Sequence, residues 1–144
     1  TLLFQGCFHS DTSQTTEMDM PPVPTNISSH EDIVLPSDLT WDSSQSMAIN
    51  TASFKGGIFH YSGRLELLSL QEFLKTSMAN NKWKLVGEAS YDKTMLAFIK
   101  PNKTCMIMLW EGIGGVLGKT HVKLYVTADL AAEKGLNPFG EPVD

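Results

Sequence analysis

The sequence predicts an α+β fold in which a mainly antiparallel sheet is covered by one helix. Three observations lead to this prediction: a glycine-punctuated hairpin pattern between residues 46 and 65, one amphipathic helix pattern between residues 69 and 81, and a series of short apolar segments separated by turn residues. Together they describe a hairpin, one helix and a three-stranded meander. A length of 144 residues allows one modest domain.

The predicted hairpin consists of "SMAINTASF" and "IFHYSGRL", joined by a turn at "KGG", where glycine supplies the backbone freedom of a tight reversal. The helix is predicted over "SLQEFLKTSMANN". Ser69 and Glu72 have the spacing of a capping box, and Asn80 and Asn81 suit the end of the helix. Its apolar stripe comprises Leu70, Phe73, Leu74 and Met78.

The segments after the helix are "KWKLVGEASY", "TMLAFIK", "TCMIMLW" and "THVKLYV", with turns at "DK" and "PNK" and a glycine-rich loop before the last. "HVKLYV" alternates as a strand with one wet face does, whereas "MLAFI" and "CMIMLW" are apolar on both faces. One helix covers only one face. The other face therefore requires "IVLPSDLTW", "LNPFGEPV" or another protein as its cover. The candidate partner-binding residues are Phe98, Met106, Met108, Trp110 and Trp41.

Charge divides the chain into an acidic leader and a nearly neutral body. Between residues 8 and 46 there are seven acidic residues and no Lys or Arg, and from residue 47 onward nine acidic and eleven basic residues. The leader is rich in Ser, Thr and Pro and has no apolar periodicity, so we expect a flexible leash over residues 7–46. The domain is expected over 47–127 and a tail over 128–144. No basic cluster predicts a nucleic-acid partner.

Motifs of catalysis, cofactor binding and metal binding are not found in the sequence. "EGIGGVLGKT" ends like a phosphate-binding loop, but the first required glycine falls on Ile113 and a strand pattern follows, so no nucleotide is expected. His60 and His121 lie out of phase with their apolar neighbours and are expected to be solvated or packed. Cys105 is expected to be a buried small hydrophobe. The sequence thus predicts a non-enzymatic protein without cofactor or metal.

Cys7 follows the apolar stretch "LLFQG". "LLFQGC" resembles a lipobox, the end of a bacterial lipoprotein signal peptide, which makes Cys7 the expected lipidation site and residues 1–6 the end of the signal peptide. The charged and most of the apolar region of such a peptide would lie upstream of Thr1. Two other interpretations remain open: "LFQG" also resembles the core of an engineered protease site, and the stretch fits a plain apolar terminus.

A wider resemblance covers residues from about Gly57 to Val126. The segments "YSGRL", "LQEFLKTSMANNKWKLV" and "DKTMLAFIKPNKTCMIML" are similar to those of a group of small uncharacterised bacterial envelope lipoproteins. This sequence has Lys82 where that group commonly has Gly before the Trp. The resemblance implies a periplasmic, membrane-anchored domain, with no activity attached.

Two functions are expected from these observations. The first is a non-enzymatic, lipid-anchored adaptor or structural subunit of a bacterial cell-envelope complex, on the periplasmic side and at the outer membrane. Its partners would be the membrane, through lipid on Cys7, and other envelope proteins or a second copy. The alternative is a periplasmic module that binds a lipid or small apolar ligand on its sheet face.

Overall fold

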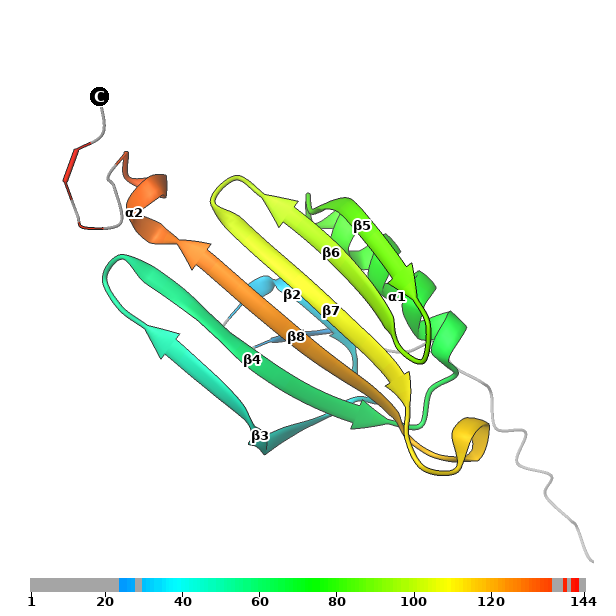
Figure 1. Ribbon diagram of the computed structural model, residues 1–144. Coiled ribbons are helices and arrows are strands. Elements are labelled where there is room, and N and C mark those ends of the chain that lie inside the picture. The colour runs from blue at the N-terminus through cyan, green and yellow to red at the C-terminus, as the bar shows by residue number, and fades with distance from the viewer. Residues whose placement is uncertain (1–23, 28–29, 136–138, 140, 143–144) are drawn as a thin grey trace, which may run out of the picture.

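A computed structural model describes residues 24–27, 30–135, 139, 141 and 142 of the chain. It has an α+β fold built on a six-stranded antiparallel sheet (Figure 1), which confirms the predicted class. The elements in chain order are β1 (Pro24–Ile27), β2 (His30–Pro36), β3 (Thr40–Asn50), β4 (Phe54–Gly63), α1 (Leu67–Asn80), β5 (Lys84–Ser90), β6 (Thr94–Lys100), β7 (Lys103–Glu111), the 3₁₀ turn Gly115–Leu117, β8 (Thr120–Asp129) and α2 (Leu130–Glu133).

The strands of the large sheet are ordered β3-β4-β8-β7-β6-β5. β5 pairs with β6, β6 with β7, and β7 with β8, so the meander has four strands and not the predicted three. β8 then pairs with β4, which joins the meander to the β3–β4 hairpin. β1 and β2 form a separate two-stranded sheet. Figure 1 shows α1 behind β5 and β6, and β2 behind β7 and β8, so the helix and the small sheet cover the same face.

The prediction of a flexible leash up to residue 46 is wrong from Pro24 onward, because β1, β2 and the start of β3 lie in that range. The cause is the apolar content of "IVLPSDLTW", which is enough to join the core. Ile33, Leu35 and Leu39 are buried, and the indole Nε1 of Trp83 donates to the carbonyl of Asp32 at 3.0 Å. Cys7 and the earlier part of the predicted leash lie outside the described residues.

The helix begins two residues earlier than predicted. Glu66 is the N-cap, and its carboxylate accepts hydrogen bonds from the amides of Leu68 and Ser69, so the predicted capping box of Ser69 and Glu72 is wrong. The reason is that a carboxylate at Glu66 already satisfies the free amides of the first turn, and it also accepts from the Ser69 hydroxyl. The predicted apolar stripe is confirmed by the burial of Leu70, Leu74 and Met78, with Phe73 packed at its edge.

The predicted hairpin turn at "KGG" is wrong, because Gly56 and Gly57 lie inside β4. The chain reverses at residues 51–53, where the Thr51 amide donates to the Phe54 carbonyl at 2.8 Å. A Cβ atom at Gly57 would come within 2.5 Å of the Met47 carbonyl oxygen. The glycines therefore permit close approach of neighbouring strands and do not form the turn.

The two faces of the large sheet separate by strand parity. One face packs against α1 and β2 and carries the core side chains of the strands; these are Phe59, Leu96, Phe98, Cys105, Ile107, Leu109, Val122, Leu124 and Val126. β8 continues to Asp129 and α2 follows, with Ala128 and Ala131 buried, so the predicted tail from residue 128 is folded at its start. Neither described helix has the length and apolar character needed to cross a membrane.

Candidate interaction surface on the sheet

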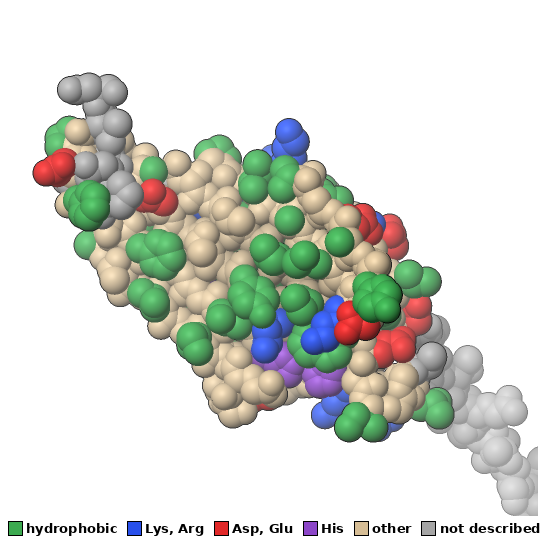
Figure 2. All heavy atoms as spheres, in the orientation of Figure 1, with side chains coloured by type: hydrophobic (Ala, Val, Ile, Leu, Met, Phe, Trp, Pro, Cys, Tyr) green, Lys and Arg blue, Asp and Glu red, His purple; other side chains and the backbone are tan. Residues whose placement is uncertain are grey.

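The face of the large sheet opposite α1 and β2 is called here the open face. Its central row crosses five strands, because the backbone register pairs Ala97 with Met106, Met106 with Tyr125, Tyr125 with Ile58, and Ile58 with Met47. Paired residues of adjacent antiparallel strands point to the same side of the sheet. Figure 2 shows this face, with hydrophobic side chains spread across most of it.

Several large apolar side chains on the open face are exposed. They lie in the central row, in the rows on either side of it and, for Phe54, one row further: Met47 (68% exposed), Ile49 (59%), Ile99 (40%), Phe54 (38%), Met95 (37%) and Met106 (36%). Isolated exposed apolar residues are normal, but neighbouring ones on a flat sheet are typical of an interaction surface. Methionine adds flexible, polarizable contact area to such a surface.

A shallow apolar groove of about 280 Å³ lies at the β3–β4–β8 end of the open face. Its walls include Met47, Ile49, Phe54, Ile58 and Tyr125. Gly56 lies at its floor, where a Cβ atom would come within 2.7 Å of the Val126 carbonyl oxygen and 3.0 Å of the Phe54 ring. The absence of a side chain at Gly56 therefore keeps the strands close and leaves room for that ring.

A polar cluster interrupts the apolar surface. Nε2 of His60 and Nδ1 of His121 are 3.1 Å apart, and the two rings stack with an interplanar angle of 15°. Trp110 stacks on His121 at 5.2 Å between ring centroids, and the Lys93 ammonium lies 4.7 Å from the centre of the Trp110 ring. Figure 2 shows histidine side chains together on this face of the molecule.

Asp42 extends this polar cluster onto β3. Its Oδ2 is 3.5 Å from Nδ1 of His60, beyond good hydrogen-bond length, and that buried nitrogen has no hydrogen-bond partner among the described residues. Hydrogen bonds from Ser44 and Gln45 lower the pKa of Asp42 to about 2. Burial, the neighbouring His60 and Lys119 lower the pKa of His121 below 6.5.

Asp42, His60 and His121 form a line of neighbouring polar side chains, in which the two imidazoles are hydrogen-bonded to each other. The nearby Ser46 hydroxyl is held in place, since it donates to the Asp42 carbonyl and accepts from Trp41 Nε1 and the His60 amide. These hydrogen bonds of Ser46 connect the β3 bulge to β4 beside the two imidazole rings. Within the described residues, no group of three or more His, Cys, Asp or Glu is arranged to hold a metal ion.

The structure separates the five predicted partner-binding residues. Met106, Met108 and Trp110 share the open face, as their strand parity requires. Phe98 lies on the opposite face, 1% exposed in the core, because it pairs with the buried Cys105. Trp41 pairs with Tyr61, which packs against the core, so Trp41 belongs to an edge of that side; it is 54% exposed.

The two cysteines have different outcomes. Cys105 is fully buried, as predicted, and burial raises the pKa of its thiol to about 12. Cys7 lies outside the described residues.

The stacked polar cluster was missed from the sequence. His60, His121 and Trp110 each occupy the non-core phase of their strands, and that phase was the available signal. It did not reveal that β4, β8 and β7 are adjacent, which is what brings the three rings together.

Comparisons with protein-family models, curated proteins and solved structures found no match to this chain.

Proposed function

We propose that this protein is a non-enzymatic, lipid-anchored adaptor or structural subunit of a bacterial cell-envelope complex, and that it meets its partner protein through the open face. The observation that carries the proposal is the contrast between the two faces of the sheet. α1 and β2 already close one face, and their contacts complete the core. The other face leaves Met47, Ile49 and Met106 exposed across the sheet.

A flat sheet face of this kind suits a partner that packs against it by shape. The exposed side chains are long and adaptable, and the rings of Trp110 and Tyr125 supply the rigid aromatic area that often dominates protein interfaces. The polar cluster contributes Lys93 and Lys123 as charges within reach of the apolar rows. These charges favour one orientation of the partner over others.

The membrane anchor in this proposal is lipid on Cys7, followed by residues 8–23 as the tether. A flexible tether of that length would have a mean reach of about 22 Å, at 5–6 Å times the square root of the residue number. Because β2 and β3 belong to the domain, this reach is shorter than a leash ending at residue 46 would give. The domain would therefore stay close to the membrane surface.

The proposal is tested with paired charge substitutions on the open face. Met47→Glu with Met106→Glu places two charges in the central row. The matched control is Leu68→Glu with Ala79→Glu, at two exposed apolar residues of α1, on the other side of the sheet. After affinity purification from solubilised membranes, we expect the open-face pair to lose its co-purifying protein and the control pair to retain it, at similar melting temperatures. Retention by both pairs would contradict the proposal.

A second function is favoured by the groove at the β3–β4–β8 end of the open face. Its size of about 280 Å³ and its apolar walls suit part of a lipid chain or a small apolar ligand. In this alternative, organic extraction of protein purified from membranes would release a bound apolar molecule detectable by mass spectrometry. Ile49→Glu should abolish that signal, and its persistence would place the ligand elsewhere.

A further inference from the structure

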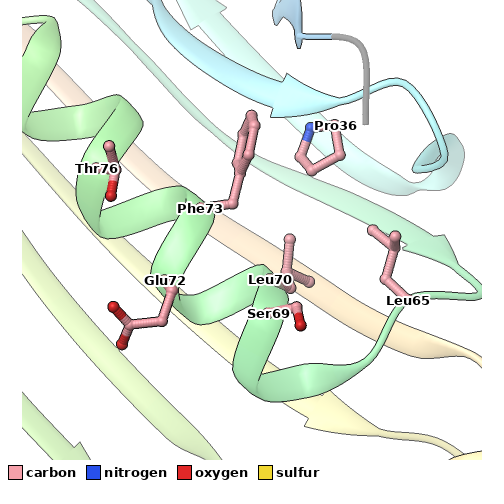
Figure 3. A pocket seen from close by; sticks show the side chains of 7 residues that line it. All are labelled: Pro36, Leu65, Ser69, Leu70, Glu72, Phe73 and Thr76. Carbon is pink, nitrogen blue, oxygen red and sulfur yellow. The ribbon is translucent and has the colours of Figure 1, made fainter. Parts of the chain in front are cut away.

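A second apolar groove lies on the opposite side of the molecule, between the first turns of α1 and the end of β2 (Figure 3). Its volume is about 370 Å³, within the size range of ligand-binding sites. Figure 3 shows Phe73 of α1 and Pro36 of β2 pointing toward one another, with Leu65 at the far end. Its lining residues are Pro36, Leu65, Ser69, Leu70, Glu72, Phe73 and Thr76.

Two of the polar side chains at this groove are engaged elsewhere. The Ser69 hydroxyl donates to the Glu66 carboxylate, and the Glu72 carboxylate lies 3.9 Å from the Lys75 ammonium. Apart from Thr76, the remaining walls are apolar, and Phe73 packs at the edge of the core. The groove thus presents a dry aromatic and proline surface without a fixed charge at its centre.

The path of the chain leads to this groove. β1 begins at Pro24, and the register of the small sheet pairs Pro24 directly with Pro36, which forms one wall. β1 and β2 are antiparallel, so β1 begins at the Pro36 end of the small sheet. The residues immediately before Pro24 in the sequence are Met20, Pro21, Pro22 and Val23, a run without charge.

We propose that the segment Met20–Val23 binds in the groove between α1 and β2 as an extended polyproline II strand. Residues 21–24 read "PPVP", a PxxP pattern, and proline-rich segments of this kind bind grooves lined by aromatic side chains. Four residues span about 12 Å in this conformation. Attachment at Pro24 makes the binding intramolecular, so it needs only a modest contact energy.

Charge defines where the bound segment ends. Asp19 precedes Met20, and the Glu72 carboxylate lies at the groove, so extension of the bound segment to Asp19 would bring two like charges together. Under the function proposed above, binding of this segment sets the side on which the tether leaves the domain. The tether would leave the domain on the α1 side, which places the open face away from the lipid anchor.

Paramagnetic relaxation in the isolated full chain tests this proposal independently of any membrane partner. In a Cys7→Ser background, a nitroxide label is attached at Met20→Cys, with Thr12→Cys as the matched control; buried Cys105 is protected from labelling. We expect the label at residue 20 to broaden the amide signals of Leu65, Phe73 and Thr76 several-fold more than the label at residue 12. Thr76→Arg, which fills the groove, should remove that broadening while the spectrum stays dispersed.

Three results would each overturn the proposal. One is equal broadening from both labels at the groove residues, and another is broadening from residue 20 centred on open-face amides such as Met106 and Tyr125. Insensitivity of the groove signals to Thr76→Arg in a folded protein would also contradict binding at this site. Because no membrane or partner is present, equal broadening or insensitivity to Thr76→Arg would leave the interaction proposed for the open face untouched, whereas broadening centred on Met106 and Tyr125 would place the segment at that face.

Discussion

His60 and His121 face each other across β4 and β8, with His60 Nε2 and His121 Nδ1 3.1 Å apart, near the end of the sheet where β8 begins. A hydrogen bond between two imidazoles requires that at least one ring nitrogen be unprotonated, so the pair is stable only while one ring is neutral. The surroundings of His121 favour its neutral form: burial, His60 and Lys119 all lower its pKa.

This arrangement predicts loss of stability in mild acid. A histidine with a lowered pKa in the folded state binds fewer protons than the unfolded chain, so its contribution is present above pH 6.5 and falls as the pH drops below that value. Burial and Lys55 lower the pKa of His30 in the same direction. Urea unfolding at pH 7.5 and 5.5 should show a smaller free energy of unfolding at pH 5.5. His121→Gln should reduce that difference, and an unchanged difference would contradict the role of this pair.

The separation of the two sheet faces predicts unequal costs for truncating Phe98 and Met106. Phe98 is 1% exposed in the core, so Phe98→Ala should lower the free energy of unfolding by about 3–5 kcal/mol. Met106 is 36% exposed on the open face, so Met106→Ala should cost about 1 kcal/mol or less. Chemical denaturation measures both, and similar costs would mean that the open face is covered within the monomer.

Replacement of Lys82 by glycine is expected to stabilise the folded protein. Lys82 follows α1 with a φ of 68°, in the left-handed region where residues other than glycine are strained by about 1–2 kcal/mol. Lys82→Gly removes the strain but adds backbone entropy to the unfolded chain, so we expect a net gain of about 0.5–1 kcal/mol in thermal or urea unfolding. Lys84→Gly, at a regular strand position of β5, is the control and should destabilise.

The ion pairs of Asp32 with Lys100 and Lys103 are expected to strengthen the attachment of β2 to the sheet. Burial raises the pKa of the Asp32 carboxyl, but hydrogen bonds and charge from Lys100 at 2.8 Å and Lys103 at 3.4 Å outweigh burial and lower the pKa overall. Its stabilising contribution is therefore present above pH 3.8 and is lost as the pH falls below it.

Asp32→Asn should accordingly cost about 1–2 kcal/mol at pH 7. It should also increase hydrogen exchange at β2 amides more than at β8 amides. Glu31→Gln, at the exposed neighbouring position, is the control. Equal hydrogen-exchange rates of the β2 amides in Asp32→Asn and Glu31→Gln would show that apolar contacts alone attach the β1–β2 hairpin to the sheet.

The sequence pattern was sufficient for elements whose apolar residues recur at a regular spacing. The stripe of Leu70, Leu74 and Met78 and the alternation of Val122, Leu124 and Val126 predicted α1, β8 and their buried sides correctly. It failed at β2, because Ile33 and Leu35 lie within an acidic, Ser- and Pro-rich stretch whose composition resembles a linker. Lys100 and Lys103 compensate the charge of Asp32. Because they are distant in sequence, the local composition around Asp32 does not indicate them.

The candidate surface was predictable only in part. Apolar residues on both faces of "CMIMLW" indicated correctly that Met106 and Met108 would lie on a second apolar face. The assignment of Phe98 required the register between β6 and β7, because each parity of "MLAFI" is equally apolar. The His60–His121 contact required the pairing of β4 with β8, whose strands are joined by a long-range connection.

Site-specific photocrosslinking in living cells detects whether the open face contacts another protein. A photoreactive phenylalanine analogue would replace Met106 in the central row or, as the control, Leu68 on the exposed side of α1. We expect a discrete crosslinked species after irradiation from position 106 and none from position 68. A crosslinked species from position 68 with none from position 106 would contradict this expectation.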